Sequence, residues 1–275
     1  MSSGEAIAID AHAHLYPEFE VCSFLRGAVA NLSAAVTRDA LHTQPTCVVF
    51  LLSTPSKNGF RRLKEAIERE KLDCIGAEDS VSVPQERVSM QLTLRQGGQI
   101  LVVIAGRQIV SREGLEVLAL GTRQRFEEGQ STETLVRKVS REGAIPVLPW
   151  GVGKWLGRRG RLVEELIEDS TLPPFFLGDS ANRPAFWPRP SQFRRAEERG
   201  IKNLPGSDPL PFPNEARRVG CSGVFLDGSL DLRHPAQDLK RKLLDPSTSF
   251  QQFGRRETPL RFLRNQLRMQ LRKLT

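Results

Sequence analysis

The segment Ile7-Ala8-Ile9-Asp10-Ala11-His12-Ala13-His14 constrains most strongly what this chain can fold into. Side chains of an extended strand point to opposite faces with a period of two, so Asp10, His12 and His14 are expected on one side. Two imidazoles at a strand end can begin a divalent metal site. The other interpretation is a polar strand end whose histidines hydrogen-bond to loops. We favour the metal site, because two of the four histidines of the chain fall here.

The composition allows a large core and a mildly basic surface. The chain has 275 residues, 39% of them hydrophobic, which suits one large α/β domain or two small ones. Its net charge of +8 favours anionic partners, but the last fifteen residues hold five cations and no acid, and without them the charge is +3. We therefore expect a small anionic substrate. Nucleic acid is not favoured, since no recognisable motif or aromatic-basic platform accompanies the charge.

The cysteines and the N-terminus bear on the compartment. Four scattered cysteines without a CxxC pair argue against a zinc knuckle or a disulfide framework and fit a reducing compartment. No basic region followed by an apolar stretch marks a secretory signal at the N-terminus. No apolar run approaches the roughly 20 residues of a membrane-spanning helix. We expect a soluble, cytoplasmic protein without a transmembrane segment.

Apolar and amphipathic stretches alternate in a strand–helix rhythm up to residue 70 and again from residue 131, which favours a parallel sheet with helices packed outside. No linker interrupts residues 1–231, so we expect one domain there, followed by a connector and a basic helix over 232–275. Between the two rhythmic parts, short apolar runs predict successive strands with a hairpin turn at Gly97-Gly98, the strands lying at 81–83, 88–94, 100–105 and 115–120.

Polar clusters follow the late strands. Asp179 comes after a strand ending at Leu177, and Asp208 comes after one ending at Leu204. Each aspartate alone is more often a helix N-cap or a turn residue than a ligand. In parallel α/β barrels, however, chemistry gathers where the strands end. Together with the histidines of the first strand, the two aspartates are therefore predicted to take part in a metal site.

The Asp10-x-His12-x-His14 start and the late Gly206-Ser207-Asp208 resemble the first and last motifs of the polymerase and histidinol phosphatase (PHP) family. Residues 104–118 also resemble its GxE…EGxHxL region. The resemblance covers about residues 5–225. It implies a distorted (β/α)7–8 TIM-like barrel near the amidohydrolase-like metal hydrolases, here with a β-hairpin-rich insertion, and the activity of a metal-dependent phosphoesterase.

The chain departs from the family at several ligand positions. Gln108 stands for a glutamate, Glu116 for a histidine and Pro149-Trp150 for a His-Pro pair, and Pro209-Leu210 stands where the family has Ala-His. A complete three-metal site is therefore not expected. The resemblance then implies one divalent ion, at most two, of Zn, Mn or Mg, with His12, His14 and Asp208 as ligands and Asp179 or Glu116 assisting.

Further roles are expected around such an ion. Asp208 or Asp179 would act as general base or orient the attacking water. Polar loop side chains would bind an anionic group of the substrate, and the candidates are Lys154, Arg183 and Asn182. A sugar or base would stack on Trp150 and Trp155. Solvated loop charges and core tryptophans remain open interpretations. The expected function is hydrolysis of a phosphoester; the alternative is a barrel that has lost catalysis and binds a ligand or partner.

The C-terminal segment carries a stripe of leucines at spacings of three and four, namely Leu260, Leu263, Leu267, Leu271 and Leu274. This spacing predicts an amphipathic helix with arginines on its other face. Such a helix can bind an anionic membrane surface or a partner. We expect instead that its leucines pack on the barrel and its arginines face water.

Overall fold

A computed structural model describes residues 5–36, 45–54, 58–69, 81–82, 84–94 and 99–274. The helices are α1 (Val21–Val36), α2 (Gly59–Arg69), α3 (Thr132–Arg141), α4 (Arg158–Glu168), α5 (Ser191–Glu198), α6 (Pro235–Leu244) and α7 (Pro259–Leu274). The strands are β1 (Ala6–Ala13), β2 (Thr46–Ser53), β3 (Val81–Ser82), β4 (Ser89–Leu94), β5 (Gln99–Val110), β6 (Glu116–Leu120), β7 (Ile145–Pro149), β8 (Phe176–Gly178), β9 (Ser222–Asp227) and β10 (Gln251–Gly254).

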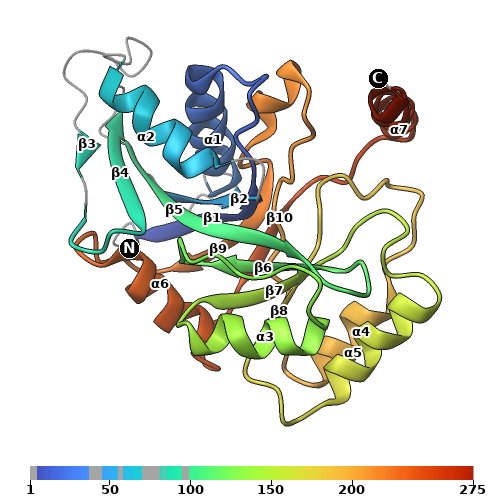
Figure 1. The fold of residues 1–275 in the computed structure, drawn as a ribbon. Helices are drawn as coiled ribbons and strands as arrows, with labels where there is room; N and C mark the ends of the chain where they lie inside the picture. The colour runs from blue at the N-terminus through green and yellow to red at the C-terminus, as the bar shows by residue number, and fades with distance from the viewer. Residues whose placement is uncertain are drawn as a thin grey trace.

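The strands form one curled, mixed sheet that makes a half-barrel, in the order β10-β9-β1-β2-β5-β6-β7-β8, with β4 on β5 and β3 on β4 (Figure 1). β1, β2 and β5 are mutually parallel, as are β7 and β8, whereas β6 runs antiparallel to both β5 and β7. The parallel parts and the central hairpins agree with the sequence prediction. The predicted turn at Gly97-Gly98 lies outside the described residues, and β9 and β10 were not predicted.

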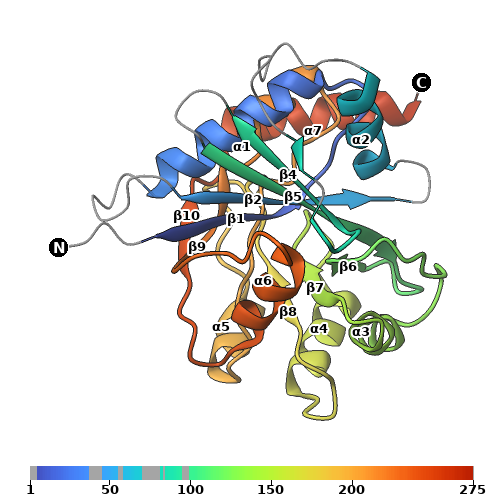
Figure 2. The ribbon, with the colours of Figure 1, turned by 90° about the vertical axis from the view of Figure 1, so that its left-hand side faces the viewer.

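The two faces of the sheet bury different side chains. On β1, Ala6 and Ala8 pack outward with Phe24 of α1, whereas Ile7 and Ile9 join the inner cluster. This separation is the period-two alternation of a strand that is buried on both faces. Leucines of α6 complete the inner cluster, and α6 lies across one end of the curled sheet (Figure 2). The opposite end, where β1, β2, β5, β7 and β8 finish, is left for polar side chains.

Residues 203–208 connect the two halves of the sheet at that polar end. Leu204 N–H donates to the carbonyl of Leu177, in β8, at 2.7 Å. Further along the segment, Asp208 N–H donates to the carbonyl of His12 at 2.7 Å, at the end of β1. The segment therefore lies between the first strand, β1, and the late strand β8.

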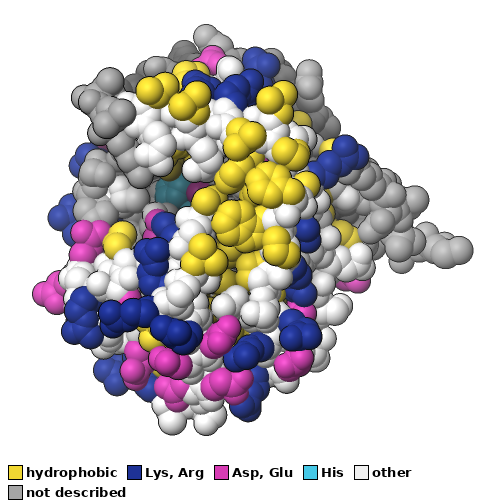
Figure 3. All heavy atoms as spheres, turned by 90° about the vertical axis from the view of Figure 1, so that its right-hand side faces the viewer, with side chains coloured by type: hydrophobic (Ala, Val, Ile, Leu, Met, Phe, Trp, Pro, Cys, Tyr) yellow, Lys and Arg dark blue, Asp and Glu magenta, His cyan; other side chains and the backbone are white. Residues whose placement is uncertain are grey.

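The orientation of α7 differs from the prediction. Four of its leucines are between 55% and 80% exposed: Leu260, Leu263, Leu267 and Leu271. Two of its arginines contact the body instead: Arg261 pairs with Glu215 at 2.6 Å, and Arg268 lies 3.9 Å from the centre of the Phe212 ring. The expected packing of these leucines was wrong, because acidic and aromatic groups of the body bind arginines of the other face of α7. Figure 3 shows hydrophobic side chains gathered in a broad patch on one face of the molecule.

The structure also bears on the expectations about the cysteines and about a membrane-spanning helix. Cys22 is disulfide-bonded, while Cys47 and Cys221 are free thiols, so the scattered spacing did not exclude a disulfide and the argument for a reducing compartment loses its support. Among the described helices, none combines the length and apolar character that crossing a bilayer requires.

Candidate metal centre

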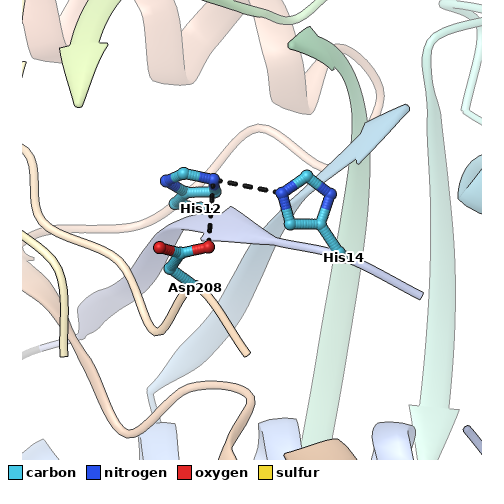
Figure 4. Close-up of side chains that lie close together, drawn as sticks. All are labelled: His12, His14 and Asp208. Carbon is cyan, nitrogen blue, oxygen red and sulfur yellow. Dashed lines mark hydrogen bonds and ion pairs between the residues drawn. The ribbon is translucent and has the colours of Figure 1, made fainter. Parts of the chain in front are cut away.

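His12 and His14 lie at the end of β1 with their rings turned toward the same point (Figure 4). Their Nε2 atoms are 3.1 Å apart, and His12 Nε2 is 3.5 Å from Asp208 Oδ1. One ligand atom from each of the three residues lies within 4.8 Å of the other two. The pairing register of β1 shifts between Asp10 and Ala13, a stretch that includes His12. Two nitrogens and one carboxylate oxygen thus converge as the ligands of a divalent ion would.

Burial keeps both imidazoles in the form that binds metal. Both rings are nearly inaccessible to solvent, and this desolvation lowers the pKa of His12 and that of His14 to about 4. Each ring is therefore neutral at neutral pH. His14 Nδ1 is 3.3 Å from the carbonyl oxygen of Leu52, and donation there leaves the Nε2 lone pair of His14 free for a metal.

Asp208 completes the group through an unusual backbone. Its φ of 44° is the only positive φ at a non-glycine residue in the described part of the chain. Ser180 Oγ donates to Asp208 Oδ2 at 3.2 Å, and Asn182 Nδ2 donates to the Asp208 carbonyl at 2.5 Å. Burial, reinforced by the charge of Glu116, raises the pKa of Asp208 to about 6. Its side chain is still 27% exposed, and Figure 3 shows a hollow with a histidine and an acidic side chain on its floor.

Asp10 does not join the group, although it was expected on the same side as the histidines. Its carboxylate is fully buried and accepts hydrogen bonds from Ser207 N–H and Oγ, His12 N–H and Gly220 N–H, at 2.5 to 3.0 Å. Gly206 explains how the late loop comes so close, because a Cβ there would lie 2.4 Å from His12 N. Asp10 and Gly206 therefore hold the ligand loop against β1.

The predicted ligands Glu116 and Asp179 lie outside the three-residue group and have cationic partners. Glu116 Oε1 accepts a hydrogen bond from Gln108 Nε2 at 3.0 Å and pairs with Lys154. Asp179 is bound at both oxygens by Arg183, at 2.8 and 2.5 Å. The Arg183 side chain is 4% exposed, so the structure gives it an internal partner and no open position for a substrate.

The tryptophans predicted as a stacking wall belong to the core. Trp150 and Trp155 are 3% and 5% exposed and lie in the hydrophobic cluster beneath β7, α4 and α5. Trp150 packs edge to face on Trp187, and Trp155 packs on Phe193. The wide, apolar faces of these rings gain more from burial between helices and sheet than from exposure at a site. The core interpretation holds for both.

Sequence reasoning did not assign three polar residues that contact the group. Gln108 places Oε1 3.3 Å from His12 Nε2, while Ser180 and Ser207 hold the two aspartates described above. The signal for the serines was local, since each follows or precedes an aspartate in a predicted strand-end loop. Gln108 was identified only as a departure from the family pattern.

No known family profile matches the sequence, and no curated protein matches it. Among solved structures, PsfC from Pseudomonas syringae superposes with a TM-score of 0.54 at 13% identity, over 91% of this chain and 92% of PsfC. The lesion-specific endonuclease PfuEndoQ from Pyrococcus furiosus gives a TM-score of 0.47 at 12% identity, over 84% of this chain and 56% of the endonuclease. The chain spans about half the length of that enzyme. This chain and PsfC share a fold.

Proposed function

We propose that this chain is a metal-dependent hydrolase that cleaves a phosphoester of a small anionic substrate, as a divergent member of the PHP family with a distorted TIM-like barrel. One observation carries the proposal: one ligand atom from each of His12, His14 and Asp208 lies within 4.8 Å of the other two, at the polar end of the sheet. The three residues come from the two motifs that resemble the family. The fold shared with PsfC is compatible with it.

The donor set fits one divalent ion. Two neutral imidazoles and a carboxylate favour zinc or manganese over magnesium, which prefers oxygen ligands and keeps most of its water. A bound ion of this kind lowers the pKa of a coordinated water and polarises the bond that is cleaved. The ligands would be His12, His14 and Asp208, without Glu116 or Asp179, whose carboxylates bind cations of the protein.

The protein's own groups supply the remaining chemistry. We assign the general base to Asp208 rather than to Asp179, because Asp208 lies at the metal group whereas both carboxylate oxygens of Asp179 are bound by Arg183. Lys154 is 31% exposed and donates only one of its three hydrogens to Glu116, which leaves two to bind a substrate oxygen. Asn182 contributes indirectly, through the Asp208 carbonyl.

A second function has an observation in its favour. Glu116 and Asp179 are both neutralised by cations of the chain, which is also expected of a barrel that has lost catalysis and binds a ligand or partner. Such a protein would keep the fold and the three-residue group without turning over a substrate.

Metal analysis of the purified protein tests the proposal. We expect about one zinc or manganese ion per chain, lost in the double variant His12→Ala, His14→Ala and kept in His234→Ala, a histidine at the start of α6 outside the group. A screen of phosphomonoesters, oligonucleotide phosphodiesters, amides and lactones then identifies the substrate. Metal content at background level in the wild type would contradict the proposed hydrolase. Bound metal without turnover of any phosphoester would favour the ligand-binding barrel.

A further inference from the structure

Glu116 stands beside the metal centre with its carboxylate already occupied. Oε1 accepts the hydrogen bond from Gln108 Nε2 at 3.0 Å and lies in direct ionic contact with Lys154 Nζ. The same Gln108 side chain reaches His12 Nε2 with its oxygen, at 3.3 Å. A chain of contacts therefore runs from the ligand His12 through Gln108 to Glu116 and ends on an ammonium group.

The loop after β7 forms a tight turn that directs the Lys154 side chain toward Glu116. Lys154 N–H donates to the carbonyl of Gly151 at 2.9 Å, and Gly153 has a φ of 72°, which closes a tight turn. Gly151 leaves room for the lysine stem, since a Cβ there would lie 2.7 Å from Lys154 Cδ. The next residue, Trp155, anchors the loop in the core. The ammonium is thus directed back toward Glu116.

The charges around the centre call for a cation at this position. Asp208 and Glu116 interact electrostatically, and so do Asp208 and Lys154. The Glu116 carboxylate adds a second negative charge beside the group of His12, His14 and Asp208. The site therefore attracts more positive charge than the three-residue group would alone. Glu116 is only 17% exposed, so it cannot rely on solvent for its compensation.

We propose that the Lys154 ammonium takes the place of a second metal ion at Glu116 and thereby limits the centre to one ion. The inference rests on the proposed function. The chain carries its own fixed cation at Glu116, the carboxylate beside the three-residue group that a second ion would need as a ligand. A substrate anion would then meet one metal ion and one ammonium.

The variant Lys154→Met tests this, since it removes the charge and keeps most of the stem. The protein is dialysed against zinc or manganese, and bound metal is counted per chain. We expect one ion in the wild type, two in Lys154→Met, and one again in the double variant Lys154→Met, Glu116→Gln. The charge-preserving Lys154→Arg and the surface control Lys138→Met on α3 should both stay at one.

The outcomes distinguish failure of this inference from failure of the proposed hydrolase function. One ion in both the wild type and Lys154→Met overturns the inference and leaves the hydrolase standing. Two ions in the wild type or in Lys154→Arg also overturn it, since the ammonium would then not be what limits the site. Absence of metal from the wild type contradicts the proposed function itself.

Discussion

The carboxylate of Asp10 holds Ser207 by two hydrogen bonds, from the backbone N–H at 2.9 Å and from the hydroxyl at 2.5 Å. The two residues are 197 positions apart in the sequence. Because Ser207 precedes Asp208, this pair sets the third member of the metal group beside the first two. Asp10 thus supports the site without being a ligand, as buried partners of ligand residues commonly do.

Replacing Asp10 with asparagine should weaken metal binding and the fold together. An amide has one acceptor oxygen, so some of the four donors that face Asp10 lose their partner, at about 1–3 kcal/mol for each buried group left unpaired. We expect a lower free energy of unfolding in urea and metal affinity reduced about 10- to 100-fold. Asp245→Asn, in an exposed turn, serves as control. Unchanged metal affinity in Asp10→Asn would contradict the supporting role.

Gly206→Ala should separate the loop that carries Asp208 from β1 by steric overlap, without removing a hydrogen bond. The added Cβ would lie 2.4 Å from backbone and side-chain atoms of His12, so β1 and the loop must separate. We expect loss of metal binding in calorimetric titration and a reduced melting temperature. Gly178→Ala, at the end of β8, is the matched control, because its nearest neighbour atom would be at 3.2 Å. Equal effects of the two substitutions would argue against a special close approach at Gly206.

Metal affinity should depend on pH through a single proton near pH 6. Metal competes with protons for its ligands. In the metal-free protein the pKa of Asp208 is raised to about 6, whereas those of His12 and His14 are lowered to about 4. As pH falls from 6 toward 4, affinity should drop by about tenfold per unit, and more steeply only below that.

Calorimetry in buffers of different ionisation enthalpy measures this proton count. Asp208→Asn should bind metal more weakly at every pH and lose the dependence between pH 8 and 5. Release of two or more protons near pH 6 would contradict the single-proton prediction. Asp10→Asn then tells whether the extra proton comes from Asp10, whose pKa burial also raises to about 6, or from a histidine of ordinary pKa.

Polar substitutions on the leucine stripe of α7 should leave stability almost unchanged. Leu263 and Leu267 are each 62% exposed, so Leu263→Gln and Leu267→Gln should change the free energy of unfolding by less than about 0.5 kcal/mol. Phe262→Ala, on the buried face of the same helix, should cost about 3–5 kcal/mol. Urea unfolding compares the three variants, and a large loss in either leucine variant would show that the stripe packs on the body.

Local pattern determined much of this protein. The apolar runs and their spacing predict most of the helices and strands, and the alternation of a strand holds from Ala6 to Ala11, because strand periodicity is a property of the backbone alone. The register shift between Asp10 and Ala13, which brings His12 and His14 together, is not visible in that pattern. The motif Gly206-Ser207-Asp208 also pointed to the third member of the group. The missed strand β10 has a single apolar side chain, Phe253, whereas β9 carries the short apolar run Val224-Phe225-Leu226, which the sequence reasoning did not use.

Only the tertiary structure decided which charges are free. Asp179 and Arg183, and likewise Glu116 and Lys154, carry site-like residue types, and their mutual pairing depends on distances across loops that no local pattern encodes. The same holds for α7, whose amphipathic spacing is visible in the sequence while the face that binds the body depends on Glu215 and Phe212. The opening His12-x-His14 motif is therefore half of a site that a buried aspartate, a glycine and a distant loop complete.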